Sequence, residues 1–560
     1  MSSPSGSKSV AHQLEFATTD PQPTSPRTTL WLAAAIIVGL LLRVHCLFYP
    51  YLWLDEFVTL WSIGGATYGT MLDRSLHWTA SGPLFVLCYR VSLDLVGDVE
   101  WGLKLPGVIL GTFTVWAASW TARQLFDRRD VALAAAWLVA LAPQFIHFSQ
   151  EGRPYMIGSL LVMLATGSLA AWIRNQRRYE LAALVVLSLS AVGFHLLAAL
   201  ALIAQNLFVF LYGLQSNWPR RRWFEWVAAQ LAIAVGLWFV GAQFRMLSGR
   251  HNSMILETNL PMPTRQSLDQ GVWGQLQVEL SIACVGLAIC WCARRFPQIE
   301  LANAWNKHAT AILLAASSYL VPTILLTSLS LARVLDCWAR YYFLFHAGFM
   351  LALAWLVVCA FPRRLSQCLL AAVLIGMISQ FNLVGGIPSC RLNGIWLDFS
   401  EAGRDLRRRI GPYDLVLSRS GLIEANQSRF LNDPNGASYL KAFLEASDGA
   451  LPGEHVPLPF SPESPEMREY LDRLFERVSN RRDFWLVNLG TPDFDYADWI
   501  AIRFGDRLRK VEQLDYPALS MYRYMSVSPS VGIDSGEKKG TSDSVTATVS
   551  KVPCQRSMLE

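Results

Sequence analysis

Long apolar runs separated by short polar loops make up most of the chain. The first run, Trp31 to Phe48, is long enough for one membrane crossing. Later runs cover residues 103–121, 131–148, 155–173, 179–214, 223–244, 272–293, 309–331, 341–360 and 366–386. The run 179–214 is too long for one span and predicts two short helices that meet near Phe194 and His195. The pattern predicts a polytopic α-helical membrane protein with about eleven spans.

Arginine clusters between the runs predict their orientation. They lie at Arg123/Arg128/Arg129, Arg174/Arg177/Arg178, Arg220/Arg221/Arg222, Arg294/Arg295 and Arg363/Arg364. Under the positive-inside rule these loops are cytoplasmic and the first span runs outward. A long external loop then follows to about residue 102, in which Pro83 to Gly97 carries Arg90 and Asp94. We expect that stretch to form a juxtamembrane amphipathic helix and not a span.

The composition changes after Pro388. Helix-like segments (399–410, 465–481) alternate with strand-like ones (414–418, 484–489), which predicts a small α/β domain. We therefore expect a disordered cytoplasmic tail at 1–29, a transmembrane catalytic domain at 30–389, an extracytoplasmic α/β domain at 390–527 and a disordered tail at 528–560. An odd number of spans after a cytoplasmic N-terminus places the α/β domain outside.

Composition agrees with a membrane protein, since 52% of residues are hydrophobic and only 16% are charged. The net charge of +5 reports mostly the loops beside the spans, so it gives no reason to expect a nucleic-acid partner. The ten cysteines are scattered and lack paired spacing, which predicts neither a disulfide framework nor a zinc site.

Candidate chemistry begins with Asp55 and Glu56, two adjacent acids a few residues past the first apolar run. An ionised side chain near the hydrocarbon boundary is costly and is a functional-site hypothesis by default. The structural alternative is a solvated loop in which these acids cap the next helix.

Other polar residues fall on the same predicted outer face. They are His77, Trp78, Lys104, Gln150, Glu151, Arg153, Tyr155, His195, Arg333, Asp336, Arg340 and Tyr341. Carboxylates together with several cations suit the transfer of a group from an anionic lipid, which needs a base for the nucleophile and positive charge for the departing phosphate.

Each cation and the histidine also has a structural interpretation. Lys104 is open to a snorkelling role at the interface, and His195 to hydrogen-bonded packing. Arg153 is open to an ion pair with Glu151, and Arg340 to an interfacial anchoring role beside its tyrosines. The convergence of these residues on one face favours the functional interpretation.

A series of motifs in order resembles the membrane-embedded GT-C glycosyltransferases, in the branch related to protein O-mannosyltransferases and the lipid A aminoarabinose transferase. The motifs are Leu54-Asp55-Glu56, Ser81-Gly82-Pro83-Leu84-Phe85, Gly97-Asp98-Val99-Glu100-Trp101, Lys104-Leu105-Pro106, Ser149-Gln150-Glu151-Gly152-Arg153-Pro154-Tyr155 and Arg340-Tyr341. The resemblance covers roughly residues 30–390. It implies that Asp55 and Glu151 take the positions of two active-site acids and that Lys104, Arg153 and Arg340 match commonly basic positions. It also implies a polyprenyl-phosphate sugar as substrate.

One motif departs from the family pattern. Many relatives carry His-Pro-Pro-Leu-Tyr where this chain has residues 81–85, so the usual histidine is missing, and His77 lies four residues earlier. A divalent metal ion as cofactor is therefore left open, with no ligand set named.

We predict a glycosyltransferase of a bacterial inner membrane, with its active site on the extracytoplasmic side and inversion at the anomeric carbon. Asp55, Glu56 and Glu151 are the predicted catalytic residues. His77, Lys104, Arg153, Tyr155, His195, Arg340 and Tyr341 are predicted to bind substrate, and the acceptor is a lipid, glycan or protein. A polysaccharide ligase or polymerase, or a transporter, is the alternative; a transporter would place charges near mid-membrane.

Overall fold

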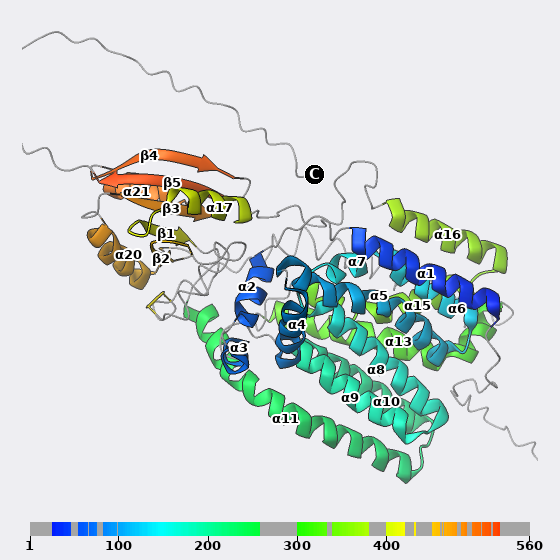
Figure 1. Cartoon of the computed structure of the whole chain (residues 1–560). Helices are drawn as coiled ribbons and strands as arrows, with labels where there is room; N and C mark the ends of the chain where they lie inside the picture. The colour runs from blue at the N-terminus through cyan, green and yellow to red at the C-terminus, as the bar shows by residue number, and fades with distance from the viewer. Residues whose placement is uncertain are drawn as a thin grey trace, which may run out of the picture.

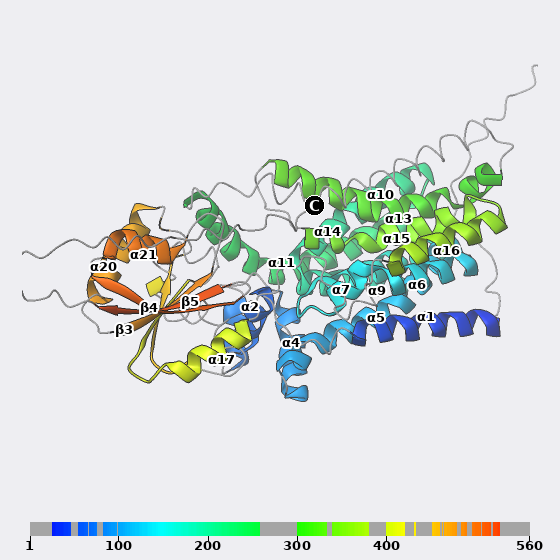
Figure 2. The same cartoon turned by 90° about the horizontal axis from the view of Figure 1, so that it is seen from above.

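The computed structural model of the chain describes residues 25–45, 54–64, 67–75, 82–97, 99–257, 300–332, 339–379, 399–419, 431–432, 451–459, 462, 464–478, 483–489, 495–505, 507–516 and 519–526. Within them, a bundle of long helices lies at one end of the molecule and a small domain with a β-sheet lies at the other (Figure 1, Figure 2).

Helices make up the described part of the bundle and the segments that join it to the sheet domain. They are α1 (Pro26–His45), α2 (Leu54–Ile63), α3 (Tyr68–Arg74), α4 (Pro83–Val96), α5 (Val99–Phe126), α6 (Arg129–Leu141), α7 (Pro143–Ser149), α8 (Tyr155–Asn175), α9 (Arg178–Phe194), η3 (Leu196–Ala198), α10 (Ala199–Gln215), α11 (Arg220–Glu257), α13 (Glu300–Leu331), α14 (Ala339–Phe343), α15 (His346–Cys359) and α16 (Arg363–Ser379). Helix α1 begins at Pro26, inside the stretch predicted as a tail.

Five helices in the described part are long and apolar enough to cross a membrane, or six if one bent pair counts as a span. The chain is thus an integral membrane protein, whereas the count of about eleven spans stays a prediction. The predicted span at 272–293 lies outside the described residues. The predicted break within 179–214 is confirmed, because α9 ends at Phe194 and η3 begins at Leu196.

The bent pair is α6 and α7, which meet at 58°. Pro143 begins α7 and has no backbone N–H, and Ala142 before it is extended. A proline inside a helix leaves the carbonyl four residues earlier without its donor. The run predicted as one span at 131–148 is therefore two helices, and carbonyls at their junction lack helical donors.

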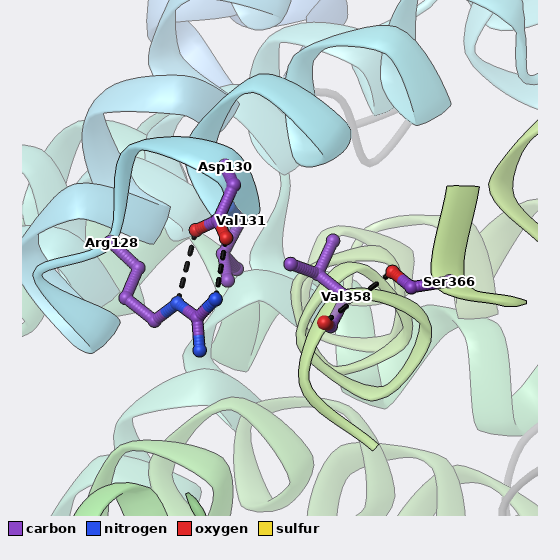
Figure 3. A network of polar contacts seen from close by, with 5 residues as sticks. All are labelled: Arg128, Asp130, Val131, Val358 and Ser366. Atoms are coloured by element: carbon purple, nitrogen blue, oxygen red, sulfur yellow. Dashed lines mark hydrogen bonds and ion pairs between the residues drawn. The ribbon is translucent and has the colours of Figure 1, made fainter. Parts of the chain in front are cut away.

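Two of the arginine-rich loops lie at the same end of the bundle. Figure 3 shows Arg128 paired with Asp130 at the start of α6, beside the turn from α15 to α16, where Ser366 Oγ donates to Val358 O at 3.4 Å. This arrangement agrees with the prediction that the loops around Arg128 and Arg363 share one side of the membrane.

The C-terminal part is an α/β domain, as the composition predicts. Its elements are α17 (Phe399–Arg409), β1 (Leu415–Arg419), β2 (Glu454–Leu458), α20 (Pro465–Val478), β3 (Asp483–Leu489), α21 (Tyr496–Phe504), β4 (Leu508–Asp515) and β5 (Leu519–Ser526). The sheet order is β2-β1-β3-β5-β4. Strands β2, β1 and β3 are parallel, and β5 runs antiparallel to both β3 and β4.

Alternate residues of the strands point to opposite faces of the sheet and enter two apolar clusters. Leu415 and Phe484 join the first cluster together with residues of α20 and α21. Val416 and Trp485 join the second cluster together with residues of α17. Both clusters also take residues from α2, so the sheet domain is packed directly onto the segments that leave the bundle.

Candidate active site

The acid-bearing helix and a tight turn of the bundle meet at Glu56. Helix α2 places Asp55 and Glu56 in its first turn, and the Glu56 side chain is 1% exposed. Its Oε1 accepts a hydrogen bond from Gly152 N at 2.7 Å. Asp55 lies one residue earlier in the helix, and its side chain is outside the described residues. The two predicted acidic motifs therefore touch, through residues that are 96 positions apart in the sequence.

Small residues allow this contact. A Cβ on Gly152 would lie 3.2 Å from Leu103 Cβ and 3.4 Å from Glu56 Oε1. A Cβ on Gly107, in α5, would lie 2.5 Å from Ser149 O. Because a real Cβ cannot come that close to a backbone oxygen, the glycine at 107 lets the 149–152 segment lie directly on α5.

A fully buried arginine of the first span holds the other side of this turn. Arg43 donates from Nη2 to Val139 O at 3.2 Å and from Nη1 to Ala140 O at 3.4 Å. These are carbonyls at the α6–α7 junction, where Pro143 leaves Val139 O without a helical donor. Arg43 Nε also donates to Ser149 Oγ at 3.1 Å. The Arg43 guanidinium thus donates to the carbonyls at the bend and holds the end of α7, just before Glu151.

Glu151 is 6% exposed and pairs with His147 at 2.9 Å between Oε1 and Nε2. Its Oε2 is buried and accepts no hydrogen bond from the residues that the structure describes. Those residues contain no group of three or more His, Cys, Asp or Glu side chains able to hold a metal ion. The structure therefore gives no ligand set for a metal ion, and the Asp55 side chain and His77 lie outside the described residues.

Two guanidinium groups lie over a cluster of rings next to this turn. The rings of Tyr155, His195 and Tyr341 have centroids 5.2 to 6.2 Å apart. Arg153 Cζ lies 5.9 Å from the Tyr155 centroid, and Arg340 Cζ lies 5.8 Å from the Tyr341 centroid. The structure thus brings together residues from the 150–154 turn, α8, the α9–η3 junction and α14.

His195 lies in the ring cluster that both guanidinium groups adjoin. The residue lies between α9 and the span that begins at Leu196. Burial lowers the pKa of His195, and the charges of Arg153 and Arg340 lower it further. The Nδ1 of His195 accepts a hydrogen bond from Leu197 N at 3.2 Å, which places the proton of a neutral ring on Nε2.

Contacts also bear on the structural alternatives. Arg153 Nη1 donates to Thr59 Oγ1 at 3.3 Å, and Glu151 Oε1 pairs with His147 Nε2. Lys104 is 4% exposed inside the protein, which disagrees with a side chain that snorkels to the interface. His195 does have the hydrogen-bonded packing role that its position in an apolar run suggested.

Within the motif at residues 81–85, Gly82 lies where two helices pack closely. A Cβ there would lie 2.0 Å from Gly193 O, so α4 begins directly against the end of α9. A proline at this position, as in many relatives, does not fit this packing. His77 lies outside the described residues, as do Trp78, Arg333 and Asp336.

Several residues at the site were not predicted. His147 carries a usable signal, because it stands four residues before Glu151 in an apolar run. Tyr89 donates to Arg153 O at 3.1 Å from a helix predicted only as amphipathic. For Arg43 the signal was an arginine within a predicted span, which is itself a marker of function or structure.

Comparisons with known proteins agree with the predicted family. Residues 80–242 match the family model described as dolichyl-phosphate-mannose-protein mannosyltransferase. The crystal structure of ArnT from Cupriavidus metallidurans in the apo state is 12% identical with a TM-score of 0.50, over 89% of this chain and 97% of that chain. The same protein bound to undecaprenyl phosphate gives 12% and 0.50 over 90% and 98%.

A weaker likeness is to the oligosaccharyltransferase of Archaeoglobus fulgidus in complex with Zn and sulfate, at 12% identity and a TM-score of 0.42 over 87% of this chain and 79% of that chain. At that score it supports no inference about a metal in this chain. No curated protein sequence matches the chain. The family model and the shared fold confirm the resemblance to the membrane-embedded GT-C glycosyltransferases that the sequence motifs predict.

Proposed function

We propose that the chain is a glycosyltransferase that moves a sugar from a polyprenyl-phosphate donor to an acceptor outside the cytoplasm, with inversion at the anomeric carbon. The observation that carries the proposal is that the Glu56–Gly152 contact lies next to a ring cluster which the guanidinium groups of Arg153 and Arg340 adjoin. An acid next to a paired cationic surface is what this reaction requires.

In the proposed reaction, Asp55 removes the proton from the acceptor hydroxyl. The acceptor oxygen forms a bond to the anomeric carbon while the bond from that carbon to the donor phosphate oxygen breaks on the opposite face. Glu56 is the next residue of α2 after Asp55, and a hydrogen bond from Gly152 N holds its carboxylate. Glu56 therefore positions Asp55. Glu151 tunes the charge near Asp55 in this proposal; its Oε2 is buried and has no hydrogen-bond partner among the described residues.

The leaving group is a polyprenyl phosphate whose negative charge grows as the bond breaks. Arg153, Arg340 and Lys104 take up that charge in this proposal, Arg153 and Arg340 through planar forks that match phosphate oxygens. The Nε2 proton of His195 and the rings of Tyr155 and Tyr341 would hold the headgroup or sugar, and His77 remains a proposed substrate ligand. Undecaprenyl phosphate in the ArnT structure supports this class of donor.

The acceptor side is the extracytoplasmic face of a bacterial inner membrane, where the domain at 399–526 also lies in this proposal. A reporter that is active only outside the cytoplasm, fused after residue 530, is expected to be active. A silent reporter with a correctly inserted chain would divide the proposed site between two faces of the membrane.

The catalytic roles are tested with two variants in proteoliposomes that contain polyprenyl-phosphate sugars. Asp55→Asn keeps the shape but cannot accept the proton, so turnover should fall by about 10² or more. Glu56→Gln still accepts from Gly152 N and should cost only about tenfold or less. Equal, mild losses in both inserted variants would make Asp55 a helix cap and remove the base from the mechanism.

A further inference from the structure

Helix α2 has two opposite faces with different partners. Glu56 and Thr59 are three residues apart, so they lie on the same face. Glu56 meets Gly152, and Thr59 meets Arg153. A residue two positions along a helix points about 200° away. Val58 therefore points away from the turn at 150–154, and Trp61, one turn further, shares that opposite face.

This opposite face is part of the core of the C-terminal domain. Val58 and Trp61 are buried in the same apolar cluster as Leu415 of β1, Phe484 of β3 and Tyr470 of α20. Side chains of α2, the helix that carries the acids, are therefore part of the apolar core of the C-terminal domain. Figure 2 shows α2 between the bundle and this domain.

The end of α2 is fixed by two arginines. Arg74 Nη1 donates to Trp61 O at 2.8 Å, and its guanidinium lies 4.5 Å from the centroid of a Trp61 ring. Arg90 Nη1 donates to Ile63 O at 2.8 Å. Cations at the last carbonyls of a helix stabilise it. Because these bonds hold the last turn of α2 together, we expect the helix to move as one rigid unit. A shift at Trp61 would then also displace the acids in its first turn.

We propose that the C-terminal domain is a positioning element of the active site, which it holds in place through Trp61 and Val58. Trp61 is then a positioning residue that acts through Glu56 and Asp55. The expected change in kcat rests on the proposed function. The expected change in hydrogen exchange of α2 does not. The contact that supports the proposal is with the acid-bearing helix, through Val58 and Trp61.

The test compares Trp61→Ala with Trp61→Phe in the full-length protein, reconstituted in nanodiscs. Hydrogen exchange of the amides in α2 and in residues 149–153 should become about tenfold faster or more in Trp61→Ala. The kcat should fall about tenfold, while the affinity for undecaprenyl phosphate changes less than about twofold. Trp61→Phe should restore most of both properties.

Trp499→Ala is the matched control, because Trp499 packs against the same apolar cluster from α21. It should speed exchange within the C-terminal domain and leave α2 unchanged. If Trp61→Ala does not insert, Val58→Ala gives the smaller truncation at the same contact.

Unchanged exchange of α2 in Trp61→Ala or Val58→Ala would overturn the proposal. Equal acceleration of α2 in Trp499→Ala would also overturn it, because the effect would then be general loosening. If no donor supports transfer but α2 still responds to Trp61→Ala alone, the proposed function fails and the positioning role stands.

Discussion

The two acidic segments of the site are supported in opposite ways. The segment 149–152 is held from within the bundle by hydrogen bonds of a buried cation, since Arg43 bonds Ser149 and the carbonyls at the α6–α7 bend. Helix α2 is held from outside by apolar packing of Val58 and Trp61 into the C-terminal domain. The two supports meet at the hydrogen bond from Gly152 N to Glu56 Oε1, next to the one from Arg153 Nη1 to Thr59 Oγ1.

This difference follows from where each segment lies. Inside a membrane bundle there is little hydrophobic driving force between helices, and free carbonyls are costly, so a polar clamp gives specificity. Outside it, water is present and apolar burial becomes the main driving force. The account therefore predicts that the bundle side fails when a donor is lost and the domain side fails when volume is lost.

The largest effect is expected for Arg43→Met, which breaks the polar support. It leaves Val139 O, Ala140 O and Ser149 Oγ without their donor, and each buried unsatisfied group costs about 1–3 kcal/mol. Thermal unfolding in detergent should show a loss on the order of 3 kcal/mol or more, and turnover should be lost with it. Arg128→Met at the opposite end is the control, because exposed pairs contribute about 1 kcal/mol or less.

A milder Arg43→Met phenotype, equal to that of Arg128→Met, would mean that water or other groups satisfy the bend. Arg43→Lys should be intermediate, since an ammonium group cannot reproduce the fork that reaches the bend and Ser149 together.

The next effect is expected for Gly107→Ala, which keeps the clamp but moves the segment that it holds. The new Cβ would lie 2.5 Å from Ser149 O, so the turn must shift away from α5. Turnover should fall by about tenfold or more, because small displacements of positioned groups are costly in catalysis. Gly376→Ala in α16 is the control, since its Cβ meets no atom within 4 Å. If both glycine variants turn over like the wild type, close packing on α5 does not set the site.

Arg340 belongs to the part of the site that the helix bundle supports, so its variants should differ from those of Trp61 in α2. Arg340→Lys keeps the charge and loses the fork, so both turnover at saturating donor and donor affinity should fall, by about tenfold. Trp61→Ala, in contrast, should leave donor affinity nearly unchanged. Should Arg340→Lys be neutral in both quantities, the phosphate site lies elsewhere, and Arg153 is the next residue to vary.

The smallest effect is expected at Lys104. As a buried point charge it should tolerate Arg but not Met, with Lys104→Met several-fold slower and Lys104→Arg close to wild type in turnover. A Lys104→Met enzyme with unchanged turnover and donor affinity would return this residue to a packing role.

The sequence predicted those features that depend on local pattern. The break at His195 follows from a run too long for one span, and α17, β1, α20 and β3 follow from periodicity after Pro388. The predicted topology placed the two acidic motifs on one face, and the family resemblance implied that both belong to the active site. The bend at Pro143 was missed, although a proline in an apolar run signals one.

Features that depend on distant partners were not predictable in this way. The carbonyls that Arg43 bonds lie 96 and 97 residues away in the sequence, and no local pattern shows them. Likewise, the place of Trp61 in the core of the C-terminal domain depends on a sheet that starts at Leu415. Tertiary packing, and not propensity, decides both.

The measurement that tests the central claim most directly is transfer from a defined donor by the purified, reconstituted chain. Radiolabelled polyprenyl-phosphate sugars are supplied alongside nucleotide sugars and lipid-diphosphate oligosaccharides, and the anomeric configuration of the product is determined. The account predicts product from a polyprenyl-phosphate sugar alone, with release of the polyprenyl phosphate and an inverted anomeric centre. Transfer from lipid-diphosphate donors only, a retained configuration, or no product from any donor would contradict it.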